Sequence, residues 1–361
     1  MRNSSSSNSS LFVAAVVLQA IIGGSVISGS HGFSSSTPWL STSTSSSSTT
    51  TTSSSSSSSS LGMGSKSATK WERKQGWLES RGIGSSSSDD AEGTITTSPF
   101  AAIVGNGRIG GALAEAGNCI VLGRGYSVDA DTGEGPILLA TRNDALDDII
   151  ESCPEDRRKD LVFLQNGYLD DFLESKGLSQ NTQVLLFMSV PAKGVDPVDG
   201  VTSFNPEGLT AATGEWAHAF ADRLASIQLK CNVVTAEDYR PAMFEKLMWI
   251  STYMLVGAAN NCPTVGDAGK DHGDTVEAIV TELVAAVSQK ENIEFPEGTI
   301  DRLKSYTDVV ANFPCGVKEF EWRNKYFWDL GDDAVPTHNA LLKECAEKGI
   351  LSFDLPTTTT E

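Results

Sequence analysis

Short apolar runs alternate with amphipathic stretches in the first half of the sequence that follows residue 98. These runs occupy residues 100–104, 118–122, 135–141, 160–164 and 182–188. Buried strands that alternate with short helical patterns are typical of a doubly wound parallel sheet. The pattern therefore predicts an α/β fold in which residues 98–238 form a parallel-sheet domain.

The pattern changes after residue 214. Residues 216–224 have helical periodicity and residues 231–235 form one more short apolar run, but from residue 241 the spacing is almost wholly helical. A segment of this length can form a core of its own. We therefore expect residues 239–355 to form an all-helical C-terminal domain.

The helix expected at residues 242–259 is apolar on nearly every face, which predicts that it is buried. Glu245 and Lys246 lie within it. A buried ammonium group is costly unless it is paired, and loss of water lowers the pKa of a lysine towards the range of a general acid. The alternative is that Lys246 extends its amine to the surface from near the start of the helix.

The N-terminal segment differs from globular sequence. Residues 1–32 combine Arg2 with an apolar run at residues 11–22 that is too short to span a membrane, which is typical of a signal peptide. Residues 33–71 are rich in Ser and Thr and contain no acid, so we expect them to be disordered. Residues 72–97 indicate a polar linker.

This leader also predicts where the protein is located. An acid-poor, hydroxyl-rich stretch after a signal peptide resembles the bipartite presequence of algae with secondary plastids, and transit peptides share that composition. We therefore expect import into a plastid. The alternative is a secreted protein with a Ser/Thr-rich linker.

Composition excludes several kinds of partner. The formal net charge is −19; all 46 acidic residues but only 24 of the 27 basic ones lie at or beyond Glu72, so that part has a formal charge of −22. Such a body repels nucleic acid and anionic membranes, and we expect neither as a partner once the leader is removed. The cysteines and histidines show no metal-ligand spacing, so no metal site is expected.

The first apolar run ends in three glycines. Gly105 allows a sharp turn from the strand, Gly107 allows the backbone to approach a diphosphate, and Gly110 allows helix and strand to pack closely. The following helix would present free N–H groups to an anion. The pattern indicates a Rossmann-type dinucleotide site, and the alternative is an ordinary tight turn. The expected cofactor-binding residues here are Gly105, Asn106, Gly107, Arg108, Ile109 and Gly110.

Two arginines at predicted strand ends indicate which dinucleotide binds. Arg124 lies 19 residues after Gly105, where an acid suits the ribose of NAD and an arginine suits the 2′-phosphate of NADP. Arg142 follows the run at residues 135–141, and ligands bind at the carboxyl ends of parallel strands. These cations favour NADP(H) as the cofactor. The alternative for Arg124 is a solvated loop residue.

Four motifs occur in an order that resembles the ketopantoate reductase (2-dehydropantoate 2-reductase) family. They are the glycine turn, Gln-Asn-Gly at residues 165–167, Glu-Lys-Leu at 245–247 and the segment 319–324. The resemblance covers about residues 98–352. It implies a Rossmann domain that binds NADP(H), an all-helical domain, a small-molecule substrate in the cleft between them, and a place in pantothenate biosynthesis. A homodimer is possible.

The resemblance also implies three catalytic residues. Lys246 matches the lysine that protonates the carbonyl oxygen while NADPH delivers hydride. Asn166 matches an amide that contacts cofactor and substrate, and Glu319 matches an acid that contacts the substrate hydroxyl or the cofactor ribose. Arg124 and Arg142 match contacts to the cofactor phosphates. Structural roles stay open as alternatives, because Asn-Gly is a common turn pair and Glu319 lies in a charged helix.

The sequence departs from the family where the family holds its substrate. The family has Asn four and eight residues after the lysine and often at position 264, whereas this chain has Ile250, Met254 and Thr264. The remaining candidates for substrate contact are Ser251, Asn260 and Thr264. We expect NADPH-dependent reduction of a 2-oxo acid. The alternatives are a less polar carbonyl or imine substrate, or a nucleotide-binding protein without catalysis.

Overall fold

The computed structural model describes residues 100–125, 127–129 and 132–356. The predictions made for residues 1–32, 33–71 and 72–97 concern residues outside this set. Each helix in the described part of the chain is too short or too polar to cross a membrane.

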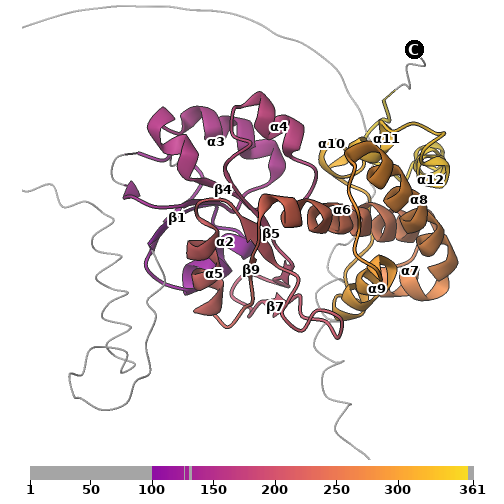
Figure 1. The fold of residues 1–361 in the computed structure, drawn as a ribbon, viewed down its shortest axis with the longest axis horizontal. Helices are drawn as coiled ribbons and strands as arrows, with labels where there is room; N and C mark the ends of the chain where they lie inside the picture. The colour runs from indigo at the N-terminus through magenta and orange to yellow at the C-terminus, as the bar shows by residue number, and fades with distance from the viewer. Residues whose placement is uncertain (1–99, 126, 130–131, 357–361) are drawn as a thin grey trace, which may run out of the picture. The chain divides into compact units, whose positions relative to one another are not determined.

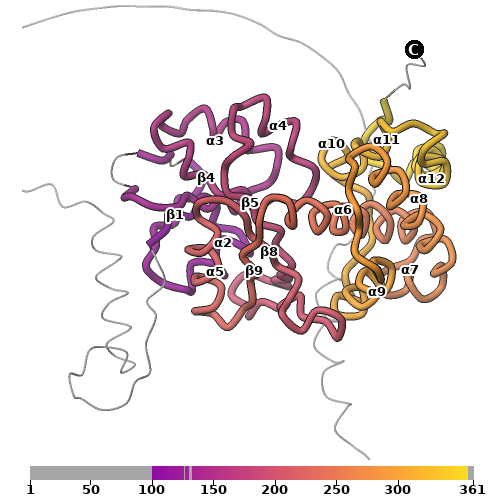
Figure 2. The backbone as a smooth tube through the Cα atoms, viewed as in Figure 1, coloured from indigo at the N-terminus to yellow at the C-terminus, as the bar shows by residue number. Residues whose placement is uncertain are grey.

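Seven strands form one sheet in the described residues. Their order across the sheet is β2, β1, β3, β4, β5, β8, β9, and the first five pair in parallel. Figure 2 labels β1, β4, β5, β8 and β9 along the backbone. The bounds are β1 (Ala101–Val104), β2 (Cys119–Leu122), β3 (Ile137–Leu139), β4 (Leu161–Phe163), β5 (Thr182–Leu185), β8 (Ala211–Thr213) and β9 (Asn232–Val233). The predicted parallel sheet is confirmed over these five strands.

Strand β8 runs antiparallel to β5, unlike the wholly parallel sheet that we expected. The run predicted as one strand at residues 182–188 breaks after β5. The chain continues through two short strands that pair with each other, β6 (Met188–Ser189) and β7 (Val198–Asp199). A parallel return needs a long crossover, usually a helix, and no helix lies between β5 and β8. The next strand therefore enters in the opposite direction.

Helices cover both faces of this sheet, which is why its strands are apolar on both sides (Figure 1). On one face α2 (Arg108–Glu115) and α5 (Ala217–Ala225) pack against Ile103 and its neighbours. On the other face α3 (Leu146–Ser152) and α4 (Asp170–Ser175) pack against Val104 and its neighbours. Successive residues of β1 thus belong to different cores, as the two-residue period of a strand requires. Two 3₁₀ turns, Asn143–Ala145 and Glu155–Asp160, complete this part.

A buried arginine fixes α2 against α5. The guanidinium of Arg223 in α5 donates to the backbone oxygens of Leu113 at 3.1 Å, Gly117 at 3.0 Å and Asn118 at 3.1 Å. These carbonyls lie at the C-terminal end of α2 and just beyond it. Arg223 therefore helps to hold the helix whose other end borders the glycine turn.

Helix α6 (Ala236–Ala259) connects the sheet to the helical part of the chain. It begins six residues before the helix that we predicted at 242–259, because Thr235 caps it by accepting from the Asp238 backbone N–H at 3.1 Å. Pro241 lies inside the helix without ending it. Its apolar residues pack into one core with Leu185 and Phe187 from the sheet side, as its all-round apolar pattern predicts.

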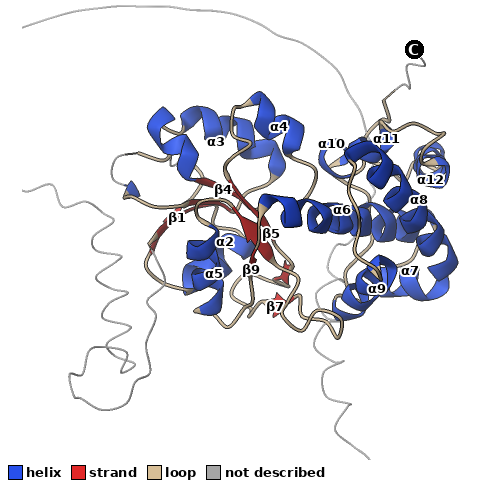
Figure 3. Ribbon diagram, in the orientation of Figure 1, coloured by secondary structure: helices blue, strands red, loops and turns tan. Residues whose placement is uncertain are grey.

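All of the described strands precede α6, and the helices after it pack on it or on one another (Figure 3). This order confirms the predicted fold class, a Rossmann-type sheet followed by helices. The later helices are α7 (Val265–Asp271), α8 (Gly273–Glu291), α9 (Thr299–Val309), α10 (Phe320–Arg323), α11 (Lys325–Trp328) and α12 (Pro336–Glu347). Residues 350–355 then return to pack near α10, where the rings of Phe320 and Phe353 are 5.3 Å apart.

Candidate active site

The glycine turn between β1 and α2 has little room for side chains at two of its three glycines. Gly105 has φ = 108°, and a Cβ there would lie 2.5 Å from the Ala140 oxygen. A Cβ on Gly110 would lie 1.9 Å from the Gly105 oxygen. A Cβ on Gly107 would meet nothing within 4 Å. Gly105 and Gly110 therefore serve the fold, whereas Gly107 borders open space at the start of α2, the kind of place where helix N–H groups can bind an anion.

A loop that follows β6 covers this turn. Arg108 Nη1 donates to the Val190 oxygen at 3.2 Å, and Lys193 Nζ donates to both the backbone oxygen and Oδ1 of Asn106 at 2.9 Å. The Lys193 side chain also lies 3.9 Å from where a Cβ of Gly111 would be. The loop thus adds an ammonium group next to the predicted diphosphate site. Sequence reasoning did not identify Lys193, although its place shortly after a predicted strand in an acidic chain was a usable signal.

A cavity of about 590 Å³ opens at the carboxyl ends of β3 and β4. It brings together residues from the glycine turn, the two strand ends and the helical part. Its lining is Arg108, Ile109, Leu139, Ala140, Thr141, Arg142, Asn143, Leu164, Gln165, Asn166, Lys318, Glu319, Arg323 and Ser352. The structure therefore places the predicted residues Arg108, Ile109, Arg142, Asn166 and Glu319 around one space.

The two arginines predicted to contact cofactor phosphates differ in their surroundings. Arg142 lines the cavity, forms an ion pair of 2.9 Å with Asp144, and keeps its side chain 75% exposed. Arg124 is exposed two residues beyond β2, the strand next to β1. Both side chains are accessible to an anionic ligand, and their contacts to a cofactor stay predictions.

Lys246 is buried, so its amine does not extend to the surface. Its Nζ donates to the Leu186 oxygen at 2.6 Å and lies 4.7 Å from the centre of the Phe187 ring. Burial, together with the positive charge of Arg323, lowers the pKa of Lys246 to about 7. Lys246 also lines a second, small cavity of about 10 Å³, enough for one water, with Gln165, Asn166 and Ile250 among the other lining residues.

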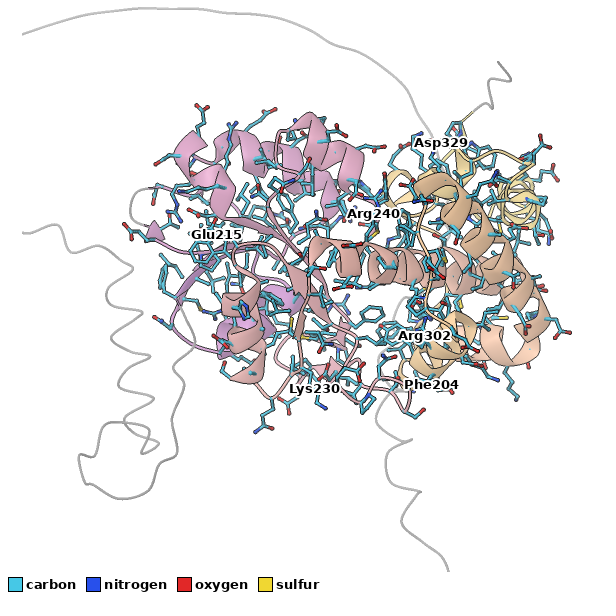
Figure 4. The ribbon with its side chains drawn as sticks, in the orientation of Figure 1. Phe204, Glu215, Lys230, Arg240, Arg302 and Asp329 are labelled. Carbon is cyan, nitrogen blue, oxygen red and sulfur yellow. The ribbon has the colours of Figure 1, made fainter. Side chains whose placement is uncertain are left out.

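Glu245, which precedes Lys246, is occupied elsewhere. It accepts from Arg302 Nε of α9 at 3.2 Å and from Thr299 Oγ1 at 2.9 Å (Figure 4 labels Arg302). These bonds tie α6 to α9 one residue away from the amine. Glu245 therefore helps to position the helix that carries Lys246.

Asn166 borders both cavities. Its backbone oxygen accepts from Asn143 Nδ2 at 3.1 Å, which fixes the turn. The next residue, Gly167, has φ = 126°, and a Cβ there would lie 2.4 Å from the Trp322 oxygen. Tyr168 N then donates to that same oxygen at 2.7 Å. The Asn-Gly pair is thus a turn that packs directly on α10, which brings Asn166 to the helical side of the cavity.

Glu319 and Arg323 form an ion pair within the first turn of α10. Glu319 is the N-cap residue and has φ = 54°. Arg323 is 13% exposed in its side chain, and its Nε is buried without a hydrogen-bond partner. Burial lowers the pKa of Arg323 and the charge of Glu319 opposes that shift. Sequence reasoning gave Arg323 no role, because a charged helix ordinarily faces water.

The three residues predicted to contact substrate lie outside the cavity walls that contain Lys246 and Glu319. Ser251 is buried, and its Oγ donates to the Arg323 oxygen at 2.7 Å. Asn260 follows α6 and donates to the Val256 oxygen at 2.9 Å. Thr264 caps α7 by accepting from the Asp267 backbone N–H at 3.2 Å. Their polar groups thus hold helix ends or the backbone of Arg323.

Among the residues that the structure describes, no group of three or more His, Cys, Asp or Glu is arranged to hold a metal ion. The six cysteines are free.

No model of a known protein family matches the chain, and no curated protein matches it. Solved structures do. The ketopantoate reductase of the PanE/ApbA family from Ralstonia eutropha JMP134 is 16% identical, with a TM-score of 0.51 over 70% of this chain and 98% of its own. The 2-dehydropantoate 2-reductase from Methylococcus capsulatus is 14% identical, with a TM-score of 0.50 over 71% and 99%. A complex of D-mandelate dehydrogenase with NADH is 15% identical, with a TM-score of 0.48 over 69% and 98%.

These likenesses show that the chain has the fold of ketopantoate reductases. The resemblance stated from the sequence motifs is therefore confirmed as a resemblance in fold. It extends over nearly the whole length of those reductases and over 70–71% of this chain.

Proposed function

We propose that this protein reduces a 2-oxo acid to the 2-hydroxy acid with NADPH, and that Lys246 is the general acid. The observation that carries the proposal is the buried Lys246 amine, whose pKa is lowered to about 7, beside Asn166 at the carboxyl edge of the sheet. A proton donor works best when its pKa is near the working pH. The fold shared with ketopantoate reductases supports the same reaction class.

When bound, the nicotinamide cofactor supplies the hydride. The open space at Gly107 and the start of α2 fit its diphosphate, and Arg108 and Ile109 extend the same wall. Exposed Arg124 beyond β2 and Arg142 in the cavity supply positive charge for phosphates. An arginine rather than an acid at position 124 is the reason for preferring NADPH over NADH.

Lys246 provides the proton. Leu186 holds Nζ through one hydrogen bond, which leaves its other N–H groups for a ligand. Nζ gives one proton to the substrate carbonyl oxygen as the carbonyl carbon is reduced, and it regains a proton from water. A cationic group beside the forming alkoxide also stabilises its charge. We assign to Asn166, which borders both cavities, the contact between cofactor and substrate, and to Glu319 a contact in the larger cavity.

One observation favours a second candidate substrate. Ile250, one turn beyond Lys246, lines the small cavity where an amide would hold a polar group of ketopantoate. A site without that amide loses selectivity for a hydroxyl-bearing substrate. The second candidate function is therefore reduction of a less polar carbonyl or imine by the same residues.

The test uses the purified protein with NADPH, NADH and a panel of 2-oxo acids. We expect NADPH to bind more tightly than NADH. We also expect turnover of at least one acid, measured as a decrease in NADPH absorbance. Lys246→Met should lower kcat by about 10²- to 10⁴-fold without changing NADPH affinity. The control is Lys348→Met, because Lys348 is exposed, pairs with Glu344 and lines neither cavity.

Other outcomes decide between the alternatives. Tighter binding of NADH than of NADPH would contradict the role of Arg124. Full turnover by Lys246→Met would contradict the assignment of Lys246 as the general acid. Intact NADPH binding with no turnover of any acid, ketone or imine would select a nucleotide-binding protein without catalysis.

We also propose that residues 1–71 direct the protein to a plastid, on the basis of their signal-like and acid-poor composition. A fluorescent fusion of residues 1–70 should accumulate in the plastid of an alga with secondary plastids. Accumulation in the medium would favour secretion instead. A homodimer stays a prediction, which light scattering of the purified protein checks.

A further inference from the structure

Arg323 faces the larger cavity from the helical side of the site. It ends α10 and lines this space together with Asn166 and Glu319. Its position is set by the backbone, because its N–H donates to the Glu319 oxygen at 3.1 Å and its own oxygen accepts from Ser251 Oγ at 2.7 Å. The backbone of Arg323, from which the guanidinium extends, is therefore held in place at the cavity wall.

The hydrogen bonds of this guanidinium are incomplete. Nη2 pairs with Glu319, whereas Nε is buried and has no partner. Buried polar groups of folded proteins nearly always have a partner, and an orphaned donor on a charged group is costly. Arg323 as a residue lines the cavity, so an oxygen-bearing anion bound there can complete the hydrogen bonding of its guanidinium.

The chemistry of the missing partner follows from the shape of the side chain. Guanidinium presents parallel N–H groups that match the two oxygens of a carboxylate or phosphate. Arg108 and Arg142, which line the same cavity from the sheet side, are the cations proposed for the cofactor phosphates. Arg323 comes instead from the helical side, the side that also carries Lys246.

Arg323 and Lys246 act on the same part of the site. Gln165 and Asn166 line both the cavity of Arg323 and that of Lys246. The charge of Arg323 also contributes to the lowered pKa of Lys246, as expected for neighbouring cations. In a 2-oxo acid the ketone oxygen and the carboxylate are on adjacent carbons. A donor for one and an anchor for the other must therefore lie close together.

We infer that Arg323 binds the carboxylate of the substrate, with Glu319 holding the guanidinium in place. The inference rests on the proposed reductase function and names its substrate class, a 2-oxo acid rather than a neutral ketone. In this chain the arginine supplies an anchor on α10 where α6 has Ile250 and Met254 in place of amides. Ser251 acts as a positioning residue through its bond to the Arg323 backbone.

The test compares an acid with its neutral analogue. The probes are 3-methyl-2-oxobutanoate and its primary amide, measured for kcat and KM and, without turnover, by calorimetric titration in the presence of NADP⁺. Arg323→Gln should raise the KM and Kd of the acid at least 30-fold and leave those of the amide within about threefold. Arg323→Lys should recover part of the loss, since it restores the charge but not the planar fork.

A second variant should change the Kd of the acid in the opposite direction. Glu319→Gln removes the negative charge beside the guanidinium but keeps an oxygen that can accept its hydrogen bond, so the Kd of the acid should fall, while Arg323→Gln raises it. This variant keeps the inference testable if Arg323→Gln does not fold. The matched control is Arg157→Gln, a similarly buried arginine paired with Asp160 before β4, for which the Kd of the acid should not change.

Any of three results would overturn the inference. Arg323→Gln weakens the binding of acid and amide equally, Arg323→Gln leaves the Kd of the acid unchanged, or Glu319→Gln does not lower the Kd of the acid. These results are separate from those that test the reductase function. If the acid binds in a way that depends on Arg323 but is not turned over, the reductase function is wrong and carboxylate binding by Arg323 stands. If acids are turned over equally well with and without Arg323, the reductase function stands and carboxylate binding by Arg323 is wrong.

Discussion

The amine of Lys246 lies 4.7 Å from the centre of the Phe187 ring. The ring and the rest of the core exclude water, which disfavours the charged form, while the ring face and the Leu186 oxygen favour it. Burial has the larger effect, because the pKa of Lys246 falls to about 7. This lysine can therefore change protonation in the neutral pH range.

The first prediction concerns the pH dependence of turnover. A general acid must be protonated, so kcat with a 2-oxo acid should be highest below pH 7 and fall about tenfold per pH unit above the pKa of Lys246. Arg323, which pairs with Glu319, is the charged group that acts with burial to lower the pKa of the amine, and Asp170 lines the same small cavity. A Glu319→Gln variant should move the falling limb to lower pH, because it exposes Lys246 to more of the Arg323 charge. A rate that stays constant to pH 9 would contradict this assignment.

The second prediction concerns stability. The pKa of Lys246 is lower in the folded chain than its ordinary value of 10.5, so the unfolded chain binds more protons between about pH 7 and pH 10. The free energy of unfolding contributed by this group should therefore rise with pH across that window, and its penalty is greatest below pH 7. Lys246→Met, which cannot titrate, should be more stable than the wild type at pH 6, and this advantage should shrink by pH 9. Urea unfolding at the two pH values measures it, and a constant difference between the variants would count against a buried, titrating amine.

The third prediction separates fold from binding within the glycine turn. Gly110→Ala places a Cβ 1.9 Å from the Gly105 oxygen, so it should lower the free energy of unfolding by about 1–3 kcal/mol or more. Gly107→Ala fills open space, so stability should change little while NADPH binding weakens at least tenfold. Urea unfolding and NADPH titration check both variants. Equal loss of stability in the two would reject this division of roles.

The fourth prediction concerns the loop that covers the turn. Lys193→Met removes the ammonium beside Asn106, so the Kd of NADPH should rise roughly fivefold at low salt, on the order of 1 kcal/mol. The effect should shrink as salt is added, because a partly exposed charge is screened. Lys343→Met, which breaks an exposed pair with Asp332 on the helical side, is the matched control. An unchanged Kd for NADPH would show that Lys193 only fastens the loop.

Patterns that depend on neighbouring residues were predictable from the sequence. The glycine turn occurs where the spacing of Gly105, Gly107 and Gly110 indicated it, and the all-round apolar pattern of α6 correctly predicted that Lys246 lies in a buried helix. The Asn166 turn and Glu319 reach one cavity, as the resemblance implied. In each case the residues of one short segment are enough to explain the structure that it forms.

Features that depend on distant segments were not predictable in this way. Lys193 reaches Asn106 across 87 residues through a loop without regular pattern. From the sequence alone, Arg323 resembles a solvent-exposed charge on a helix. In the structure the turn at Gly167 packs on α10, and the Arg323 side chain is largely buried. The strand predicted to continue through residue 188 leaves the sheet early, and that departure lets Leu186 and Phe187 reach Lys246.

Main-chain carbonyls do much of the anchoring in this site. Leu186 holds the Lys246 amine through its backbone oxygen, and Ser251 holds Arg323 through the arginine's own backbone oxygen. A backbone oxygen persists whatever side chain its residue carries. Positions such as Ile250 and Met254 can therefore be exchanged during evolution or engineering without releasing the Lys246 amine. Under the reductase function proposed above, such a site can acquire new substrates by changes at these positions while its chemistry is retained.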